Sequence, residues 1–189
     1  MILGTKADTL INSTGKIKEF IIPKSYVFTV SDWLNNSKSI EKNIRTKFKK
    51  KKIILRSSTT FEDTNSLSAA GAFDSILNIN SDKEKEIKQS IGKVINSYKK
   101  KIKKISNQQI LVQEMILGIK MSGVIFTGDS FGYNNYYTIN YDDVTGRSDT
   151  VTSGNSVYSN KTLYIYKAKK NFLRSLRFKK LIKATKEIE

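Results

Sequence analysis

The chain has 189 residues, and its 34 lysines and arginines outnumber its 17 acidic residues, giving a net charge of +17. It contains no cysteine and no histidine, which excludes disulfides, thiolate chemistry, zinc sites built from these residues and any catalytic triad that uses imidazole. This length suits one large or two small domains. Because the sequence shows no signal-peptide pattern and no apolar run of about 18 residues, we expect a cytoplasmic protein with no membrane partner.

The positive charge has two explanations. Lysines and arginines that neutralise phosphates would indicate a polyanionic partner such as nucleic acid. The basic runs Lys47 to Lys52 and Lys99 to Lys104 also resemble ordinary solvated helix faces or ends, and no known nucleic-acid-binding module accompanies them. We favour the second explanation, although the charge alone leaves a nucleic-acid partner open.

The chain begins with a strand pattern followed by a helix pattern. Residues 20–30 are rich in β-branched and aromatic side chains and predict a strand that ends near Thr29. Ser31 and Asp32 offer an N-cap to the next segment, whose apolar residues recur at helical spacing up to Phe48. A helix is therefore expected directly after the strand.

Two short strands and a long helix are expected next. The apolar runs 53–55 and 76–79 predict the strands. Over residues 87–102 apolar side chains recur at intervals of three and four, and Ser81 and Asp82 precede them as candidate caps. This pattern predicts a long amphipathic helix with lysines on its opposite face.

The second half of the chain reads mainly as strands. Three strand-like runs separated by glycine or asparagine predict an antiparallel meander. A further strand is expected, and then a helical segment that ends without a cap or a stop signal. These elements cover residues 110–116, 121–128, 134–141, 161–166 and 168–189.

A polar segment at residues 55–75 has the composition of a phosphate-binding loop. The guanidinium of Arg56 can bind two phosphate oxygens, Ser57 to Thr60 can donate hydrogen bonds, and Gly71 allows close approach of the backbone. Arg56 directly follows the apolar run 53–55, so we expect it at the C-terminal edge of a strand, where open α/β sheets place ligands. Loops rich in serine and threonine are common, so this chemistry alone is a weak signal.

The same segment resembles a family signature. RSSTTFEDTNSLSAAGAFDSILNI, residues 56–79, is similar without a gap to R-S-S-A-T-x-E-D-x-x-x-x-S-F-A-G-x-x-x-T-x-L-N-[IV] of the nucleotide-binding domain of pyruvate phosphate dikinases and phosphoenolpyruvate synthases. Further blocks of the family resemble, in the same order, LGTKADTL, IPKSYVFTV and LVQEMILGIKMSGVIFTGD. The resemblance covers the chain up to about Asn155.

The resemblance implies a mixed α/β (α+β) fold of the ATP-grasp-like nucleotide-binding type. Such a fold has two lobes, and the second lobe is an antiparallel sheet with helices. We expect residues 1–105 to form the N-terminal lobe with the phosphate-binding loop, and residues 106–189 to form the second lobe with the strand on the adenine side.

The resemblance also implies site residues. Lys6 and Arg56 would meet the phosphates of ATP and neutralise charge that develops there, which makes them the candidate catalytic residues. Other candidates for cofactor binding line either the phosphates or the adenine. They are Ser57, Gly71 and Ser75 on the phosphate side, and Gln113, Glu114 and Met115 on the adenine side.

Two segments of the family pattern are missing from this chain. They are an acidic D-x-E-W-like segment and a Q-x-R-P-like segment, whose side chains hold magnesium and phosphate in the family. We therefore expect the second lobe to be incomplete at its C-terminus, the Mg²⁺ ligands to lie outside this chain, and the isolated chain to be inactive in phosphoryl transfer.

The favoured function is the ATP-binding portion of a dikinase-type phosphotransferase. The resemblance implies that ATP would phosphorylate a histidine on a separate domain of a longer polypeptide, and that a small acceptor bound by another domain would then receive the phosphoryl group. The alternative is a non-catalytic basic module that retains the fold and binds a nucleotide or a nucleic acid.

Overall fold

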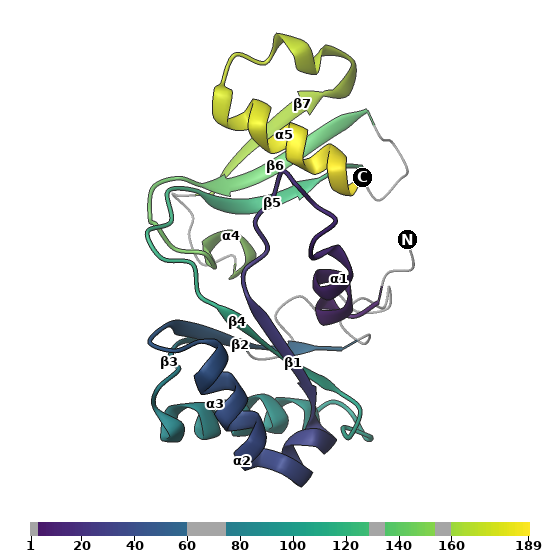
Figure 1. Ribbon diagram of the computed structural model, residues 1–189. Helices are drawn as coiled ribbons and strands as arrows, with labels where there is room; N and C mark the ends of the chain where they lie inside the picture. Colours follow the sequence, from purple (N-terminus) through teal and green to yellow (C-terminus); the bar gives the residue numbers. More distant parts are fainter. Residues whose placement is uncertain (1–3, 60–74, 129–134, 154–159) are drawn as a thin grey trace. The chain divides into compact units, whose positions relative to one another are not determined.

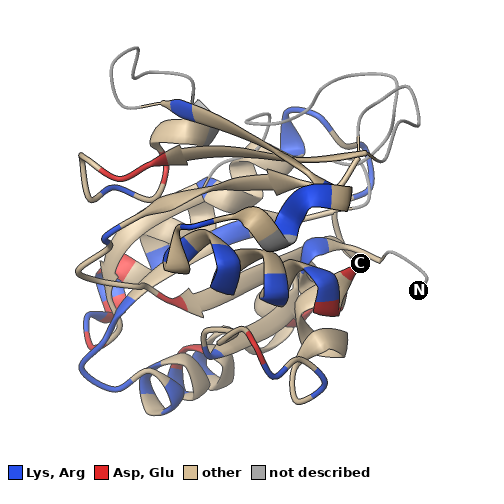
Figure 2. Ribbon diagram, turned by 90° about the horizontal axis from the view of Figure 1, so that it is seen from above, with Lys and Arg blue, Asp and Glu red and all other residues tan. Residues whose placement is uncertain are grey.

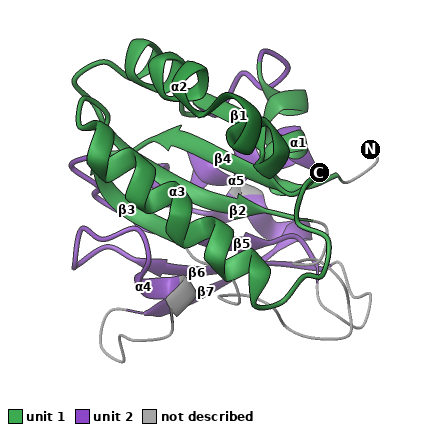
Figure 3. Cartoon of the chain, turned by 90° about the horizontal axis from the view of Figure 1, so that it is seen from below, with its two compact units in different colours: residues 1–14, 22–116 green, residues 15–21, 117–189 purple. Residues whose placement is uncertain are grey.

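The computed structural model describes residues 4–59, 75–128, 135–153 and 160–189. The chain forms two compact units (Figure 3). Unit 1 contains Met1–Thr14 and Ile22–Ile116, and unit 2 contains Gly15–Ile21 and Leu117–Glu189. Mixed helices and strands with two antiparallel sheets confirm the expected fold class.

Unit 1 is built on a four-stranded sheet in which all neighbouring strands are antiparallel. Its order is β1 (Ser25–Thr29), β4 (Gln109–Glu114), β2 (Lys52–Ser58) and β3 (Ser75–Asn80). The helices α2 (Val30–Lys47) and α3 (Glu84–Lys99) lie on the same face of this sheet (Figure 1). Their apolar sides and that face form the core, which includes Phe28, Ile44, Ile53, Leu55, Ile91, Val94, Tyr98, Ile110 and Val112.

The cap of α2 lies earlier than the sequence predicts. Thr29 is the N-cap, because its hydroxyl accepts from the backbone N–H of Asp32 at 3.1 Å. The Asp32 carboxylate in turn accepts from the backbone N–H of Thr29 at 2.8 Å, which completes a capping box and lowers the pKa of Asp32. The last residue of β1 therefore also starts the helix, and the prediction of Ser31 or Asp32 as cap was wrong.

The predicted caps of α3 have another role. The hydroxyl of Ser81 donates to the backbone oxygen of Phe48 at 2.5 Å, and the Asp82 carboxylate accepts from the backbone N–H of Lys50 at 3.3 Å. Both side chains thus bind the turn before β2, and the N-cap residue of α3 makes no side-chain cap bond. The long amphipathic helix is confirmed, but its predicted caps were wrong.

Strand β4 belongs to the sheet of unit 1, so the prediction that it starts a meander was wrong. Ile110, Leu111 and Val112 are all fully buried, although successive side chains of a strand point to opposite faces. A strand with both faces buried fits the interior of a sheet, and β4 lies between β1 and β2. The lobe boundary expected at residues 105–106 remains a prediction, and the compact units divide after Ile116.

Unit 2 contains the remaining strands in the order β5 (Ser122–Phe126), β6 (Tyr136–Asp142) and β7 (Lys161–Tyr166). The helix α5 (Leu176–Ile188) packs on one face of this sheet through a core of Tyr137, Ile139, Ile165, Phe178 and Ile182. Two short helices, α4 (Thr150–Ser153) and the 3-10 helix η2 (Lys167–Phe172), complete the unit. In the described parts of both units, no helix has the length and apolar character needed to cross a membrane.

Gly123 on β5 allows two strands to approach closely. A Cβ atom at this position would overlap the backbone oxygen of Asn140 on β6. Any other residue would therefore push β5 away from β6, which gives a structural reason for glycine in SGVIFT.

The turn after β6 is organised by the buried carboxylate of Asp142. This carboxylate accepts from the backbone N–H groups of Val144 at 2.8 Å and Thr145 at 3.0 Å. It also accepts from the hydroxyls of Thr145 and Thr150, the latter at 2.7 Å. The two hydroxyls are the main reason that the pKa of Asp142 is far below its usual value, so the turn depends on the ionised form.

We expect Asp142→Asn to lower the Tm at neutral pH, because an amide NH₂ would face N–H and O–H donors. A depressed pKa contributes stability above the unfolded value of about 3.9 and loses it as the pH falls further. The Tm difference between wild type and variant should therefore shrink below about pH 4. Thermal unfolding followed by circular dichroism between pH 2 and pH 7 measures it. Asp149→Asn, at an exposed pair with Arg147, is the matched control with little effect, and a constant Tm difference at all pH values would contradict the prediction.

Candidate functional site

Arg56 lies within β2, so its predicted place at the C-terminal edge of a strand was wrong. β2 continues to Ser58 because residues 57 and 58 still pair with β4. The sheet is also antiparallel throughout, so the rule for ligands at the carboxyl edge of parallel strands does not apply to it. Arg56 is instead the cross-strand partner of Leu111 on β4 and of Ser75 on β3.

The pairing of Arg56 with Ser75 brings two predicted phosphate residues together. Directly opposite residues of an antiparallel pair have Cβ atoms about 5 Å apart on the same face. Ser75 begins β3 and is exposed. Gly71, also predicted to line the phosphates, lies outside the described residues.

Ser57 and Ser58 lie on opposite faces of the sheet. Ser58 alternates with Arg56 and shares its face, away from α2 and α3. Ser57 pairs with the core residue Ile110 and is 2% exposed, so the structure places it on the helix side. Sequence reasoning ranked Ser57 as the site residue, but Ser58 is the serine beside Arg56.

The Arg56 side chain has a buried nitrogen without a partner. Within the described residues, its Nε is buried and makes no hydrogen bond. A buried polar group without a partner is costly, and buried donors are normally paired. Nε is also one of the donors through which arginine binds two oxygens of a phosphate or carboxylate. Arg56 is therefore suited to an anionic ligand.

The helix α1 (Lys6–Ser13) begins on this face of the sheet. The backbone N–H of Ala7 donates to the hydroxyl of Ser58 at 2.9 Å. Lys6 is the first residue of this helix, so its backbone is held near Ser58. Ser58 ends β2 and lies two residues after Arg56. The structure thus pairs Ser75 with Arg56 and brings the start of α1, which carries Lys6, to the end of the strand that carries Arg56.

Gln109 on β4 joins α1 to the sheet. Its Oε1 accepts from the hydroxyls of Thr5 at 2.6 Å and Ser58 at 3.3 Å, and its Nε2 donates to Asp8 Oδ1 at 3.0 Å. Sequence reasoning missed Gln109, because a glutamine at the start of a strand has no signature. Only the antiparallel pairing of Gln109 with Ser58 brings it to α1.

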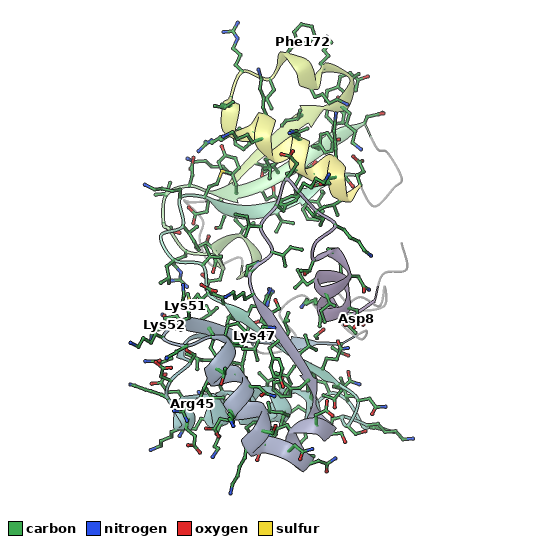
Figure 4. The ribbon with its side chains drawn as sticks, in the orientation of Figure 1. Asp8, Arg45, Lys47, Lys51, Lys52 and Phe172 are labelled. Carbon is green, nitrogen blue, oxygen red and sulfur yellow. The ribbon has the colours of Figure 1, made fainter. Side chains whose placement is uncertain are left out.

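Asp8 also helps to form the first turn of α1 (Figure 4). Its carboxylate accepts from the backbone N–H of Thr5 at 3.1 Å, and the Thr5 hydroxyl accepts from the backbone N–H of Asp8 at 3.2 Å. The bond from Gln109, followed by those from Thr5, lowers the pKa of Asp8. A Cβ atom at Gly4 would lie 2.8 Å from Asp8 Cβ, so glycine fits this cap. The T-x-x-D spacing at residues 5–8 was a sequence signal for it.

Tyr98 of α3 fixes the same junction from the helix side. Its buried hydroxyl donates to the backbone oxygen of Gln109 at 2.5 Å and accepts from the backbone N–H of Ser58 at 2.8 Å. The end of β2 and the start of β4 are thus held from both faces. These bonds hold together the strand ends next to α1.

Gln113 lies on the same face as Arg56, because it pairs with Ile54, which alternates with Arg56 along β2. Its side-chain Nε2 donates to Ser25 Oγ at 3.2 Å. This bond fixes the orientation of the amide, and the amide oxygen remains an acceptor. Gln113 therefore has the geometry to receive an N–H donor from a ligand.

The two residues after Gln113 are engaged through their backbones. The N–H of Glu114 donates to Lys24 O at 2.9 Å, and the N–H of Met115 donates to Lys52 O at 2.8 Å. The Glu114 carboxylate pairs with Lys51 at 3.0 Å. These contacts fix the strand end, and the side chain of Glu114, which pairs with the core residue Ile53, lies on the face opposite to that of Gln113 and Arg56.

The face opposite α2 and α3 therefore carries a row of positions along β4. Gln113, Leu111 and Gln109 are each two residues apart, so the row extends for about 14 Å. The amide oxygen of Gln113 is a hydrogen-bond acceptor at one end of the row. Arg56 pairs with the apolar Leu111 in the middle, and Gln109 joins α1 at the other end.

A comparison with known families gives a match over nearly the whole chain. The model described as pyruvate phosphate dikinase, AMP/ATP-binding domain, matches residues 5–187. The chain belongs to this family. The match confirms the family resemblance, and the two antiparallel sheets with their helices are consistent with an ATP-grasp-like domain. A search of curated proteins gave no significant match.

We expect Gln109→Leu to loosen α1 and lower the free energy of unfolding by about 1–3 kcal/mol, because Thr5, Ser58 and Asp8 would lose hydrogen-bond partners. The mutation should increase the rate of amide hydrogen exchange more over residues 6–13 than in α3. Gln108→Leu is the matched control, because the side chain of Gln108 makes one long bond of 3.5 Å at an exposed site. Equal exchange rates over residues 6–13 in both variants would contradict the role of Gln109.

Proposed function

We propose that the row along β4 binds AMP or ATP. The adenine would lie toward Gln113, and the phosphates toward Arg56 and Lys6. The carrying observation is the buried Arg56 Nε, which has no hydrogen-bond partner among the described residues, in a chain that belongs to an AMP/ATP-binding family. A phosphate oxygen would supply the missing acceptor.

The phosphate end offers several kinds of positive or donating group. Arg56 provides a planar guanidinium, Lys6 an ammonium group, and Ser75 a hydroxyl. The first turn of α1 adds the positive end of a helix dipole. Together these groups would neutralise charge on the phosphates and hold them in one orientation.

We further propose that the nucleotide serves phosphotransfer in a longer polypeptide. This chain has no histidine, so a phosphohistidine would be supplied by a separate domain, with the small acceptor bound by another. Arg56 and Lys6 would then stabilise charge as the phosphoryl group leaves. We also propose that this polypeptide acts in the cytoplasm. A non-catalytic basic module is the alternative if nucleotide does not bind.

The described residues of this site provide few carboxylates for a magnesium ion. The nearest carboxylate in the junction, Asp8, already accepts from Thr5 and Gln109. The described residues also contain no group of three or more histidine, cysteine or acidic side chains that could hold a metal. We keep the proposal that Mg²⁺ ligands come from outside this chain, and no step here depends on the metal.

Arg56→Lys tests the phosphate end. The variant keeps the charge but removes the forked donors, so the affinity for ATP and AMP should fall roughly tenfold or more. Isothermal titration calorimetry measures the affinity, and thermal unfolding shows whether the fold is kept. Arg45→Lys on α2 is the matched control, since this half-exposed arginine makes a long ion pair with Glu41, at 3.8 Å. Unchanged affinity in both Arg56→Lys and Arg56→Ala would overturn the assignment.

Gln113→Leu tests the adenine end. The amide oxygen of Gln113 can accept a hydrogen bond from the exocyclic amino group of adenine. Guanine has an oxygen at that position, which cannot donate. The preference for ATP over GTP should therefore shrink roughly tenfold in the variant, measured as the ratio of the two affinities. Gln108→Leu should leave the ratio unchanged. A loss of the same size for both nucleotides would mean that Gln113 does not read the base.

A further inference from the structure

A separate concentration of positive charge lies at the end of unit 2. From Lys167 to Glu189 the chain has nine lysines and arginines and only two acidic residues. Figure 2 shows these basic residues recurring along α5, the helix that ends at the C-terminus. Such a density of one sign of charge favours an anionic partner.

The charge borders a pocket between η2 and α5. Its volume is about 320 Å³, at the lower end of the range for small-molecule sites. Three of the lining lysines recur on one face of α5 at intervals of four and three residues, and the fourth comes from η2. The described lining contains no acidic residue and consists of Lys170, Leu173, Lys179, Ile182, Lys183 and Lys186.

The nearby carboxylates are engaged with other groups. Glu19 pairs with Lys183 at 2.5 Å, and Glu189 pairs with Lys167 at 2.5 Å. Glu187 accepts from two backbone N–H groups of the segment before β1, both at 2.7 Å. Among the described residues, these contacts provide a carboxylate for only one of the four lining lysines.

Two of the remaining lysines repel each other. The ammonium groups of Lys170 and Lys186 are close enough that Lys186 lowers the pKa of Lys170, mainly through direct contact and also through its like charge. Two adjacent cations destabilise one another in their charged forms. An anion placed between them would replace this repulsion with two attractions.

We propose that this pocket binds a small anion with two or more phosphate groups. Lys170, Lys179 and Lys186 would supply ammonium donors to its oxygens, and the apolar floor of Leu173 and Ile182 would limit its size. The compact volume favours such an anion over an extended chain. This site is separate from the row along β4, and the proposal does not rest on nucleotide binding there.

Inorganic tripolyphosphate, titrated calorimetrically into the full chain without metal, is the probe. Lys170→Ala with Lys186→Ala should weaken its binding roughly tenfold or more, because two charge-assisted contacts are lost. Lys169→Ala with Lys180→Ala removes the same charge from residues outside the pocket lining and should change the affinity less than threefold. The first pair of changes also removes a repulsion, so its Tm should not fall, which separates lost binding from unfolding.

Repeating the titration in Arg56→Lys distinguishes this pocket from the proposed nucleotide site, since binding at α5 should persist in that variant. Equal loss in the two double variants would show a general effect of charge and overturn the proposal, as would absence of binding to the wild-type chain. A single-stranded polynucleotide is the competing occupant, because Phe172 on η2 is 81% exposed and could stack on a base. Tighter binding of a polynucleotide through the same lysines would also overturn it.

Discussion

The hydrogen bonds of Gln109 are the constraint on which the rest of the candidate site depends. One amide group binds Thr5, Ser58 and Asp8, and so joins the first helix, the end of β2 and the start of β4. These segments are about fifty or more residues apart in the chain. Without this junction, Lys6 would be only one of the many lysines of the chain, on a short helix. With it, Lys6 is held beside the strand that carries Arg56.

Burial and charge are used differently in the two units. In unit 1, Arg56 lies within a sheet, and its Nε is buried without a hydrogen-bond partner among the described residues. In unit 2, four lysines of α5 and η2 line an open pocket, and among the described residues a carboxylate pairs with only one of them, Lys183. The first arrangement favours selection of one ligand geometry, whereas the second favours attraction by total charge. The high net charge of the chain therefore does not have a single explanation.

The sequence predicted most elements but fewer of their boundaries. Apolar periodicity located β1, α2, α3, β7 and α5, because a buried face needs a regular repeat. It could not show that β4 leaves the predicted meander, since periodicity does not name the partner of a strand. Nor could it distinguish Ser57 from Ser58, because that depends on which face of β2 meets the core. The caps at Thr29 and before Glu84 were misplaced, as short polar side chains near a helix start compete for the same role.

The sequence by itself determined the family, the fold class and the chemical types of the phosphate residues, because these follow from motif order and side-chain chemistry. Only the tertiary structure decided that Arg56 faces Ser75, that Gln109 holds α1, and that Gln113 shares their face of the sheet. These relations come from antiparallel pairing between distant segments. Strand register and packing against α2 and α3 set them, and both are properties of the whole folded unit.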